Sequence, residues 1–168
     1  MLPEQKIEIS KARFDHAKEC LQDAKLLLTG GSYRSAANRA YYTVFHAMRA
    51  VLALDGVDMK HHSGIISEFR RRYIKTGIFE TRMSEIISVL FDVRTDSDYD
   101  DFFVISKADT AAQIENAAYF VDRIAVYLKS KNAKKYRHGM EYGSARRGTH
   151  EDIAPYVDPV FQNNVILT

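Results

Sequence analysis

Hydrophobic residues recur every three or four positions through most of the first 130 residues, which is the period of an α-helix. Four long stretches keep this spacing, residues 6–29, 32–55, 78–91 and 106–129, and a shorter one covers 62–74. No segment is a convincing strand, and no internal repeat is present. The pattern therefore predicts an all-α protein whose four or five helices pack as a bundle.

The first two helices are predicted to form an antiparallel hairpin. Gly30 and Gly31 follow the last apolar residue of the first helix, where glycines commonly end helices. Ser32 then stands where an N-cap residue belongs. Because the connection is short, we expect the second helix to run back along the first.

Two segments lack the helical period. Residues 92–105 are rich in Asp and Ser, and we expect them to form a structured loop before a fifth helix that starts near Ser106 and ends near Lys129. Residues 131–168 are basic, contain Gly and Pro, and are predicted to be an extended or flexible C-terminal tail. The predicted helical domain is therefore 1–130.

The second helix has two contrasting faces. Its apolar face gathers Ala37, Ala40, Tyr41, Val44, Phe45, Met48, Val51 and Leu52. On the opposite side, a polar stripe steps by three, four and three residues through Arg39, Tyr42, His46 and Arg49. The helix contains no Asp or Glu before its final residue, so the charge of its arginines must be met from outside the helix. It is met by water, by acidic side chains elsewhere in the fold, or by a bound anion.

The composition is that of one soluble domain with a full core, with 168 residues, 46% hydrophobic and 27% charged. A net charge of +2 by itself implies no nucleic-acid partner, but the charges lie in blocks. Residues 129–147 hold seven Lys or Arg against one acid, whereas residues 92–101 hold five Asp against one Arg. The acidic block is the obvious alternative partner for the arginines of the second helix.

One cysteine, Cys20, excludes an internal disulfide and a thiolate cluster, and a reducing compartment explains it most simply. We therefore expect a cytoplasmic protein. No apolar run approaches the roughly 18 residues of a membrane span, and the first residues lack the apolar core of a signal peptide.

The sequence predicts no metal and no cofactor. His61 and His62 are adjacent, point to different sides, and have no further ligand at metal-binding spacing. Cys20 has no evident base near it in the sequence, so a reactive thiol is not expected.

Residues 32–77 resemble the HEPN domain (higher eukaryotes and prokaryotes nucleotide-binding), in its small prokaryotic branch of stand-alone proteins. The matching motifs are Ala40-Tyr41-Tyr42, Phe45-His46-Ala47, His62-Ser63-Gly64, Lys75-Thr76-Gly77 and the segment 94–99. The resemblance extends over about residues 10–130 and leaves the basic tail outside.

The resemblance implies an up-down helical bundle of HEPN type that is usually a homodimer. Many HEPN proteins are metal-independent endoribonucleases with an Arg, four to six residues and then a His. Others are toxins paired with a small nucleotidyltransferase antitoxin, and some have lost catalysis. Arg39 and His46, with six residues between them, satisfy the motif and are the predicted catalytic pair.

Further site residues follow from the same resemblance. In toxin members the Arg–His–Tyr motif lies late in the chain, where this sequence has Arg94, Asp98 and Tyr99 but no His. We therefore expect these three residues, with Tyr42 and Arg49, to bind phosphate or a nucleotide.

Metal-free RNA cleavage needs a base for the 2′-hydroxyl, an acid for the leaving 5′-oxygen, and positive charge at the phosphate. His46 can act as base or acid, and a two-fold dimer would supply a second copy of it. The competing hypotheses are a non-catalytic module that binds RNA, a nucleotide or a nucleotidyltransferase, and a dimerisation protein whose polar stripe pairs with the acidic segment 92–101.

Overall fold

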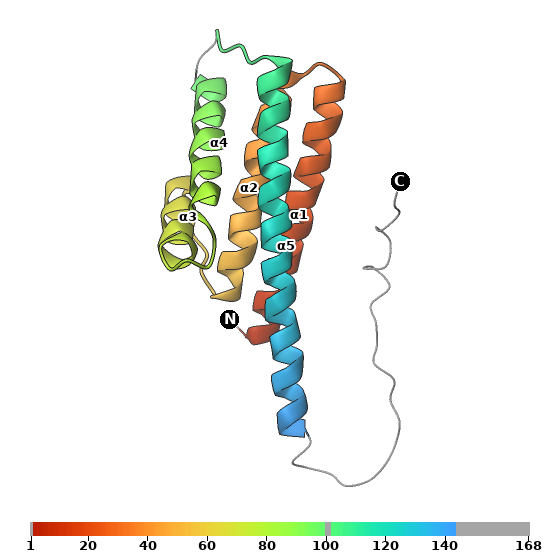
Figure 1. Ribbon diagram of the computed structural model, residues 1–168, viewed down its shortest axis with the longest axis vertical. Coiled ribbons are helices and arrows are strands. Elements are labelled where there is room, and N and C mark those ends of the chain that lie inside the picture. The colour runs from red at the N-terminus through yellow and green to blue at the C-terminus, as the bar shows by residue number, and fades with distance from the viewer. Residues whose placement is uncertain (1, 100–101, 144–168) are drawn as a thin grey trace. The chain divides into compact units, whose positions relative to one another are not determined.

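A computed structural model describes residues 2–99 and 102–143 of the chain. Its elements are α1 (Pro3–Thr29), α2 (Tyr33–Leu54), α3 (His62–Phe69), one π-helical turn η1 (Arg70–Ile74), α4 (Thr81–Tyr99) and α5 (Lys107–Gly143). The described residues contain no strand, so the predicted all-α fold is confirmed. Residues 1–132 form one compact unit, in which the long helices run alongside one another (Figure 1).

Helices α1 and α2 form the predicted hairpin, and a short connection that contains Gly30 and Gly31 joins them. Gly31 has a φ of 78°, a conformation that side chains other than glycine rarely adopt. The Ser32 amide donates to the Leu27 carbonyl at 2.9 Å, which closes the end of α1. Fully buried small side chains then line both helices: Ala17, Cys20, Ala24, Ala36, Ala40 and Ala47.

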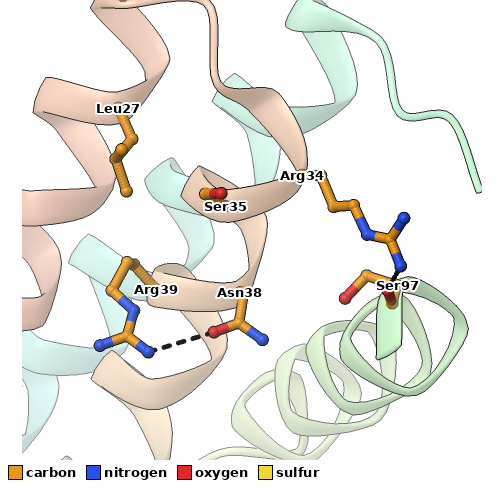
Figure 2. Close-up of a pocket in the computed structure, with 6 residues that line it drawn as sticks. All are labelled: Leu27, Arg34, Ser35, Asn38, Arg39 and Ser97. Carbon is orange, nitrogen blue, oxygen red and sulfur yellow. Dashed lines mark hydrogen bonds between the residues drawn. The ribbon is translucent and has the colours of Figure 1, made fainter. Parts of the chain in front are cut away.

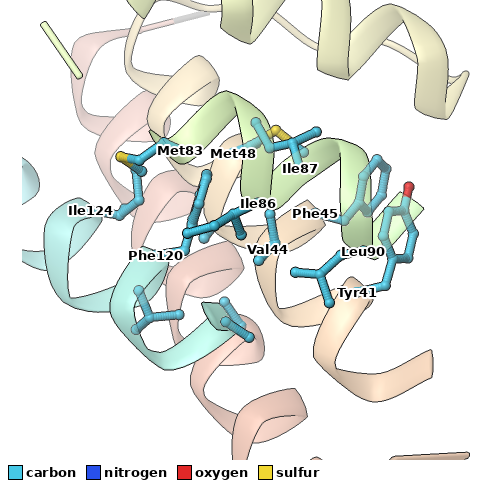
Figure 3. Close-up of a cluster of buried hydrophobic side chains, with 14 of the residues drawn as sticks. Tyr41, Val44, Phe45, Met48, Met83, Ile86, Ile87, Leu90, Phe120 and Ile124 are labelled. Carbon is cyan, nitrogen blue, oxygen red and sulfur yellow. The ribbon is translucent and has the colours of Figure 1, made fainter. Parts of the chain in front are cut away.

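The core lies where α2, α4 and α5 meet. Its side chains include Tyr41, Val44, Phe45 and Met48 of α2, Met83, Ile86, Ile87 and Leu90 of α4, and Phe120 and Ile124 of α5 (Figure 3). These positions repeat at helical spacing within each helix, as the sequence pattern predicts. The apolar face of α2 is thus buried, and the polar stripe on its other side is left for a different neighbour.

Two helix boundaries differ from the prediction. Helix α4 continues to Tyr99, so the expected loop at 92–105 is wrong over its first eight residues. This polar part is packed into the bundle: Ser97 is buried, and its carbonyl oxygen accepts a hydrogen bond from Arg34 of α2. Thr95 and Ser97 turn their hydroxyls back onto the Phe91 and Arg94 carbonyls, each at 2.9 Å. Contacts with another helix therefore hold these residues in α4 without an apolar repeat.

Helix α5 reaches Gly143, beyond the end expected near Lys129. The rest of the predicted tail, residues 144–168, lies outside the described residues, as do 100 and 101. No described helix combines the length and the apolarity that crossing a bilayer requires.

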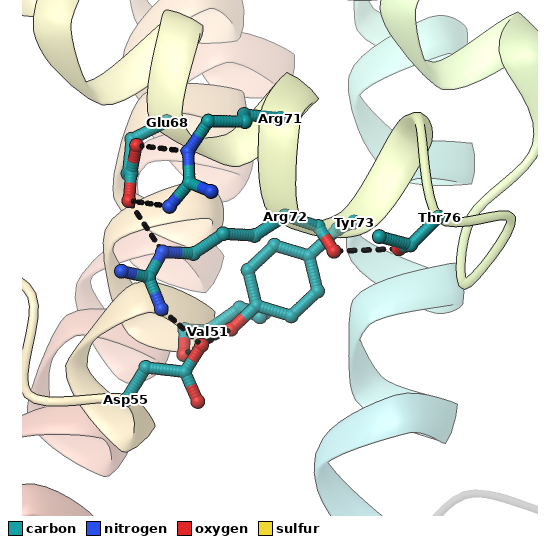
Figure 4. A network of polar contacts seen from close by, with 7 residues as sticks. All are labelled: Val51, Asp55, Glu68, Arg71, Arg72, Tyr73 and Thr76. Carbon is teal, nitrogen blue, oxygen red and sulfur yellow. Dashed lines mark hydrogen bonds and ion pairs between the residues drawn. The ribbon is translucent and has the colours of Figure 1, made fainter.

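The arginine run after α3 is held within the fold (Figure 4). Arg71 and Arg72 both bind the Glu68 carboxylate, and their hydrogen bonds lower the pKa of Glu68 to about 2. Buried Tyr73 donates to Asp55 Oδ2 at 2.7 Å and lies 3.3 Å from the Val51 carbonyl oxygen. The π-helical turn is therefore tied to the C-terminal end of α2.

We expect the Tyr73→Phe variant to lose about 1 kcal/mol of unfolding free energy, because it deletes one hydroxyl hydrogen bond and keeps the buried ring. Urea unfolding followed by circular dichroism measures the change. Tyr99→Phe is the control, since Tyr99 is 80% exposed and its hydroxyl should contribute little. Equal stability of both variants would show that the Tyr73–Asp55 contact does not hold the turn.

Candidate functional site

The polar stripe of α2 faces α1 and is half-buried at Arg39, Tyr42, His46 and Arg49. The four residues are linked along the helix by their rings and charges. The Arg39 guanidinium lies over the Tyr42 ring at 4.9 Å, and the Tyr42 and His46 rings stack at 6.1 Å between centroids. The structure thus places the predicted catalytic pair, Arg39 and His46, on one partly exposed surface. The predicted binding residues Tyr42 and Arg49 lie on the same surface.

Helix α1 adds two residues to this surface that the sequence did not suggest. The His16 ring packs edge-on against the His46 ring, with 4.2 Å between centroids. Arg13 donates to the Arg49 carbonyl oxygen at 3.4 Å. His16 and Arg13 are thirty or more positions from His46 and Arg49 in the sequence, so these contacts arise only from the packing of α1 against α2.

The two arginines at one end of the surface share a carboxylate. Arg13 and Arg49 donate to Asp58 Oδ1 at 2.8 and 3.2 Å. Burial is the largest single influence on this carboxyl and raises its pKa, but the hydrogen bonds and charges of the two arginines together outweigh it, so the pKa of Asp58 is lowered. Asp58 lies in the loop between α2 and α3. The acid that meets Arg49 therefore comes from this loop, while the side chains of Asp98, Asp100 and Asp101 lie outside the described residues.

Arg39 has a different environment. It donates to the Asn38 side-chain oxygen at 3.2 Å, and no carboxylate of the described residues lies within ion-pair distance of it. A pocket of about 330 Å³ opens beside it, lined by Leu27, Arg34, Ser35, Asn38, Arg39 and Ser97 (Figure 2). The Arg39 guanidinium and several neutral polar groups line this space, and the Arg34 guanidinium beside them donates to the Ser97 carbonyl oxygen (Figure 2). Its chemistry suits an anion such as a phosphate group.

Partial burial lowers the pKa of His46 to about 4, and the charges of its neighbours add to the effect. These neighbours are His16 and Arg13 from α1 and Arg49 and Arg39 from α2. The imidazole is therefore neutral at physiological pH and can accept a proton. An anion bound beside the arginines would offset their charge and raise this pKa.

The predicted site residues Arg94, Asp98 and Tyr99 belong to α4, a different helix from the α2 that carries Arg39 and His46. Arg94 is half-buried, and its charge acts on Tyr41 and His62, which are joined by a 2.7 Å contact between the Tyr41 hydroxyl and His62 Nδ1. His62 stacks on Phe45 at 4.1 Å between centroids, so aromatic rings separate Arg94 from His46. Tyr99 is 80% exposed. Of Asp98, the structure describes the backbone alone.

The expectation that Cys20 has no base near it is wrong. His16 Nε2 lies 4.0 Å from Cys20 Sγ, because residues four apart on a helix share one face. The spacing of His16 and Cys20 can be read from the sequence. Their closeness to His46 cannot, since it depends on how α1 and α2 pack.

Comparison with known proteins agrees with the fold. A model of the HEPN domain matches residues 10–127. A UPF0332 protein of Thermotoga maritima is 34% identical over 108 residues, which are 64% of this chain and 82% of the relative. A protein of Methanocaldococcus jannaschii named "Putative toxin" is 33% identical over 123 residues, 71% of this chain and 88% of the relative. A UPF0332 protein of Archaeoglobus fulgidus is 33% identical over 121 residues, 72% and 91%.

We expect the His46 imidazole to titrate near pH 4 in NMR spectra of the ring nitrogens. Because the ordinary value is 6.5, unfolding takes up a proton between the two values, and the stability that neutral His46 contributes is lost as the pH falls from about 6.5 to about 4. Arg39→Gln should raise the midpoint and Arg71→Gln should leave it unchanged. A midpoint near 6.5 in the folded protein would contradict the burial of His46.

Proposed function

Because the chain belongs to the HEPN domain family, we propose that it is a toxin-type protein that binds RNA and cleaves it without a metal ion. Arg39 and His46 are the proposed catalytic residues. The relatives named "Putative toxin" support the toxin role at the level of the family.

One observation carries the proposal. Arg39, which no described carboxylate neutralises, lies on the same partly exposed face as His46, with the Tyr42 ring between them. A structural polar network would pair each guanidinium with an acid, as Asp58 does for Arg13 and Arg49. The exception at Arg39, beside an anion-sized pocket, favours a phosphate ligand.

The reaction would be an internal transfer within RNA. His46 takes the proton of a ribose 2′-hydroxyl, the 2′-oxygen attacks the adjacent phosphorus, and the bond from phosphorus to the 5′-oxygen breaks. The guanidinium of Arg39 stabilises the charge that develops on the phosphate oxygens. The products are a 2′,3′-cyclic phosphate and a 5′-hydroxyl, so no water and no metal enter this step.

An acid must also protonate the leaving 5′-oxygen. We propose a homodimer in which a second copy supplies its His46 for this step. His16, whose ring lies against His46 in the same chain, is the other imidazole near the site. Two facing stripes would also double the positive charge along the RNA. Arg94 and Tyr99 would then bind nucleotides beyond the scissile phosphate, with Asp98 alongside them.

A toxin of this kind requires a partner that holds it inactive, and we propose a small nucleotidyltransferase for this role. The rival function is a non-catalytic module that binds RNA or a nucleotide through the same surface. The network of Arg13, Arg49 and Asp58 favours this rival, because one carboxylate already offsets part of the positive charge near His46.

Purified protein incubated with RNA and EDTA tests the proposal. We expect wild type to cleave RNA to 2′,3′-cyclic phosphates. His46→Ala should slow cleavage by about 10²–10⁴-fold, the contribution of a general base. Arg39→Gln should slow it by about 10²–10³-fold, since it removes charge at the phosphate.

Arg71→Gln is the matched control, because Arg71 is an exposed arginine held by Glu68 and should leave cleavage unchanged. Intact RNA with the wild type would refute the nuclease. RNA binding that weakens in Arg39→Gln would then identify the non-catalytic module, and equal binding by both proteins would refute the phosphate site as well.

A further inference from the structure

Three potential metal ligands converge where α1 meets α2. His16 and Cys20 stand one turn apart on α1, and His46 reaches them from α2. One ligand atom from each of the three lies within 4.8 Å of the other two. His16 Nε2 and Cys20 Sγ are 4.0 Å apart, and the two imidazole rings are 4.2 Å apart between centroids.

The spacing is close to that of a tetrahedral site. Bond lengths of about 2.3 Å to sulfur and 2.0–2.1 Å to nitrogen place ligand atoms roughly 3.3–3.6 Å apart around zinc. The pair His16 and Cys20 would need to close by about half an ångström, which small side-chain rotations achieve. The ligand atom of His46 lies within 4.8 Å of the other two, so it would need to approach them by up to about 1.3 Å to share the ion.

Glu19 contacts the ring nitrogen of His16 that points away from Cys20. Its Oε2 lies 3.2 Å from His16 Nδ1, and a proton on that nitrogen would be donated to the carboxylate. Nε2, which faces the Cys20 sulfur, then carries the lone pair. A carboxylate that orients a ligating imidazole in this way is the usual support of a metal-bound histidine.

Access and charge are also compatible with an ion. Cys20 is 1% exposed, whereas the His16 side chain is 51% exposed, so an ion can enter from the side of His16. Arg13, Arg39 and Arg49 oppose a cation. Burial raises the pKa of the Cys20 thiol, so a bound ion would have to displace its proton; the thiolate formed in this way and the Glu19 carboxylate would together balance the two charges of Zn²⁺.

We propose that His16, Cys20 and His46 bind a borderline or soft transition-metal ion, since thiolate and imidazole are ligands that zinc and copper ions both accept. The fourth position would be open to solvent. This replaces the expectation, drawn from the sequence, that the protein has no metal site.

The site would also regulate cleavage, a consequence that rests on the proposed function. An ion held by His46 occupies the lone pair that the proposed reaction needs for the 2′-hydroxyl proton. Bound Zn²⁺ would therefore switch the nuclease off, and its removal would free His46.

Cobalt substitution of the full chain tests the site without RNA. After removal of metals by a chelator, Co²⁺ should bind one ion per chain with the absorption of a thiolate-to-cobalt bond. Cys20→Ser should abolish that band. His16→Gln should weaken binding by at least the 10–100-fold expected for Glu19→Gln, which removes only the supporting carboxylate.

His61→Gln is the matched control, a histidine exposed in the loop before α3, and should bind cobalt as wild type does. His16 is itself exposed, so the loss of binding in its variant cannot be attributed to a disrupted core; circular dichroism verifies the fold. The proposal is overturned by a spectrum without the thiolate band. It is also overturned by binding that survives both Cys20→Ser and His16→Gln.

The regulatory consequence has its own readout. Zn²⁺ should slow RNA cleavage by wild type and leave cleavage by Cys20→Ser unaffected, because that variant keeps Arg39 and His46. Cobalt binding without any RNA cleavage would confirm the site and refute the nuclease. Cleavage that Zn²⁺ inhibits equally in both proteins would refute the regulation.

Discussion

The close packing of α1 against α2 is the constraint on which the candidate site depends. Small buried side chains, such as Ala17 and Ala24 of α1 and Ala40 and Ala47 of α2, let the two helices approach closely. Longer side chains at the edge of the contact are then forced together. The edge contact between the His16 and His46 rings is the direct result, and a larger residue at any of these alanines would separate them.

Close packing also determines the electrostatics of this edge. Several guanidinium groups converge on a partly buried imidazole, and one carboxylate, Asp58, is placed to balance two of them. Partial burial keeps His46 neutral, with a smaller contribution from the neighbouring charges, and the positive charge at Arg39 prepares the surface for an anion. A phosphate ligand and a metal ion would both use His46, but with opposite demands on the surrounding charge. The positive charge of the arginines favours the phosphate. Cys20 and Glu19, on α1, favour the metal ion because both carry negative charge when deprotonated.

Much of the fold could be predicted from the period of the hydrophobic residues, because a helix is a local structure and the spacing of its apolar residues shows which face is buried. The hairpin at Gly30-Gly31 and the apolar face of α2 are confirmed in detail. The boundary of α4 could not be predicted. Residues 92–99 have a loop-like composition, and their helical form depends on tertiary contacts: Ser97 is buried in the bundle, and its carbonyl oxygen accepts a hydrogen bond from Arg34 of α2.

The sequence by itself determined the all-α class, the family, and the stripe of Arg39, Tyr42, His46 and Arg49, since all of these depend on spacing within one helix. Only the tertiary structure decided what the stripe meets. It placed Asp58 on Arg49 and brought His16 and Cys20 to His46. The physical reason is that contacts between helices depend on their rotation and register, which arise from the packing of the whole bundle.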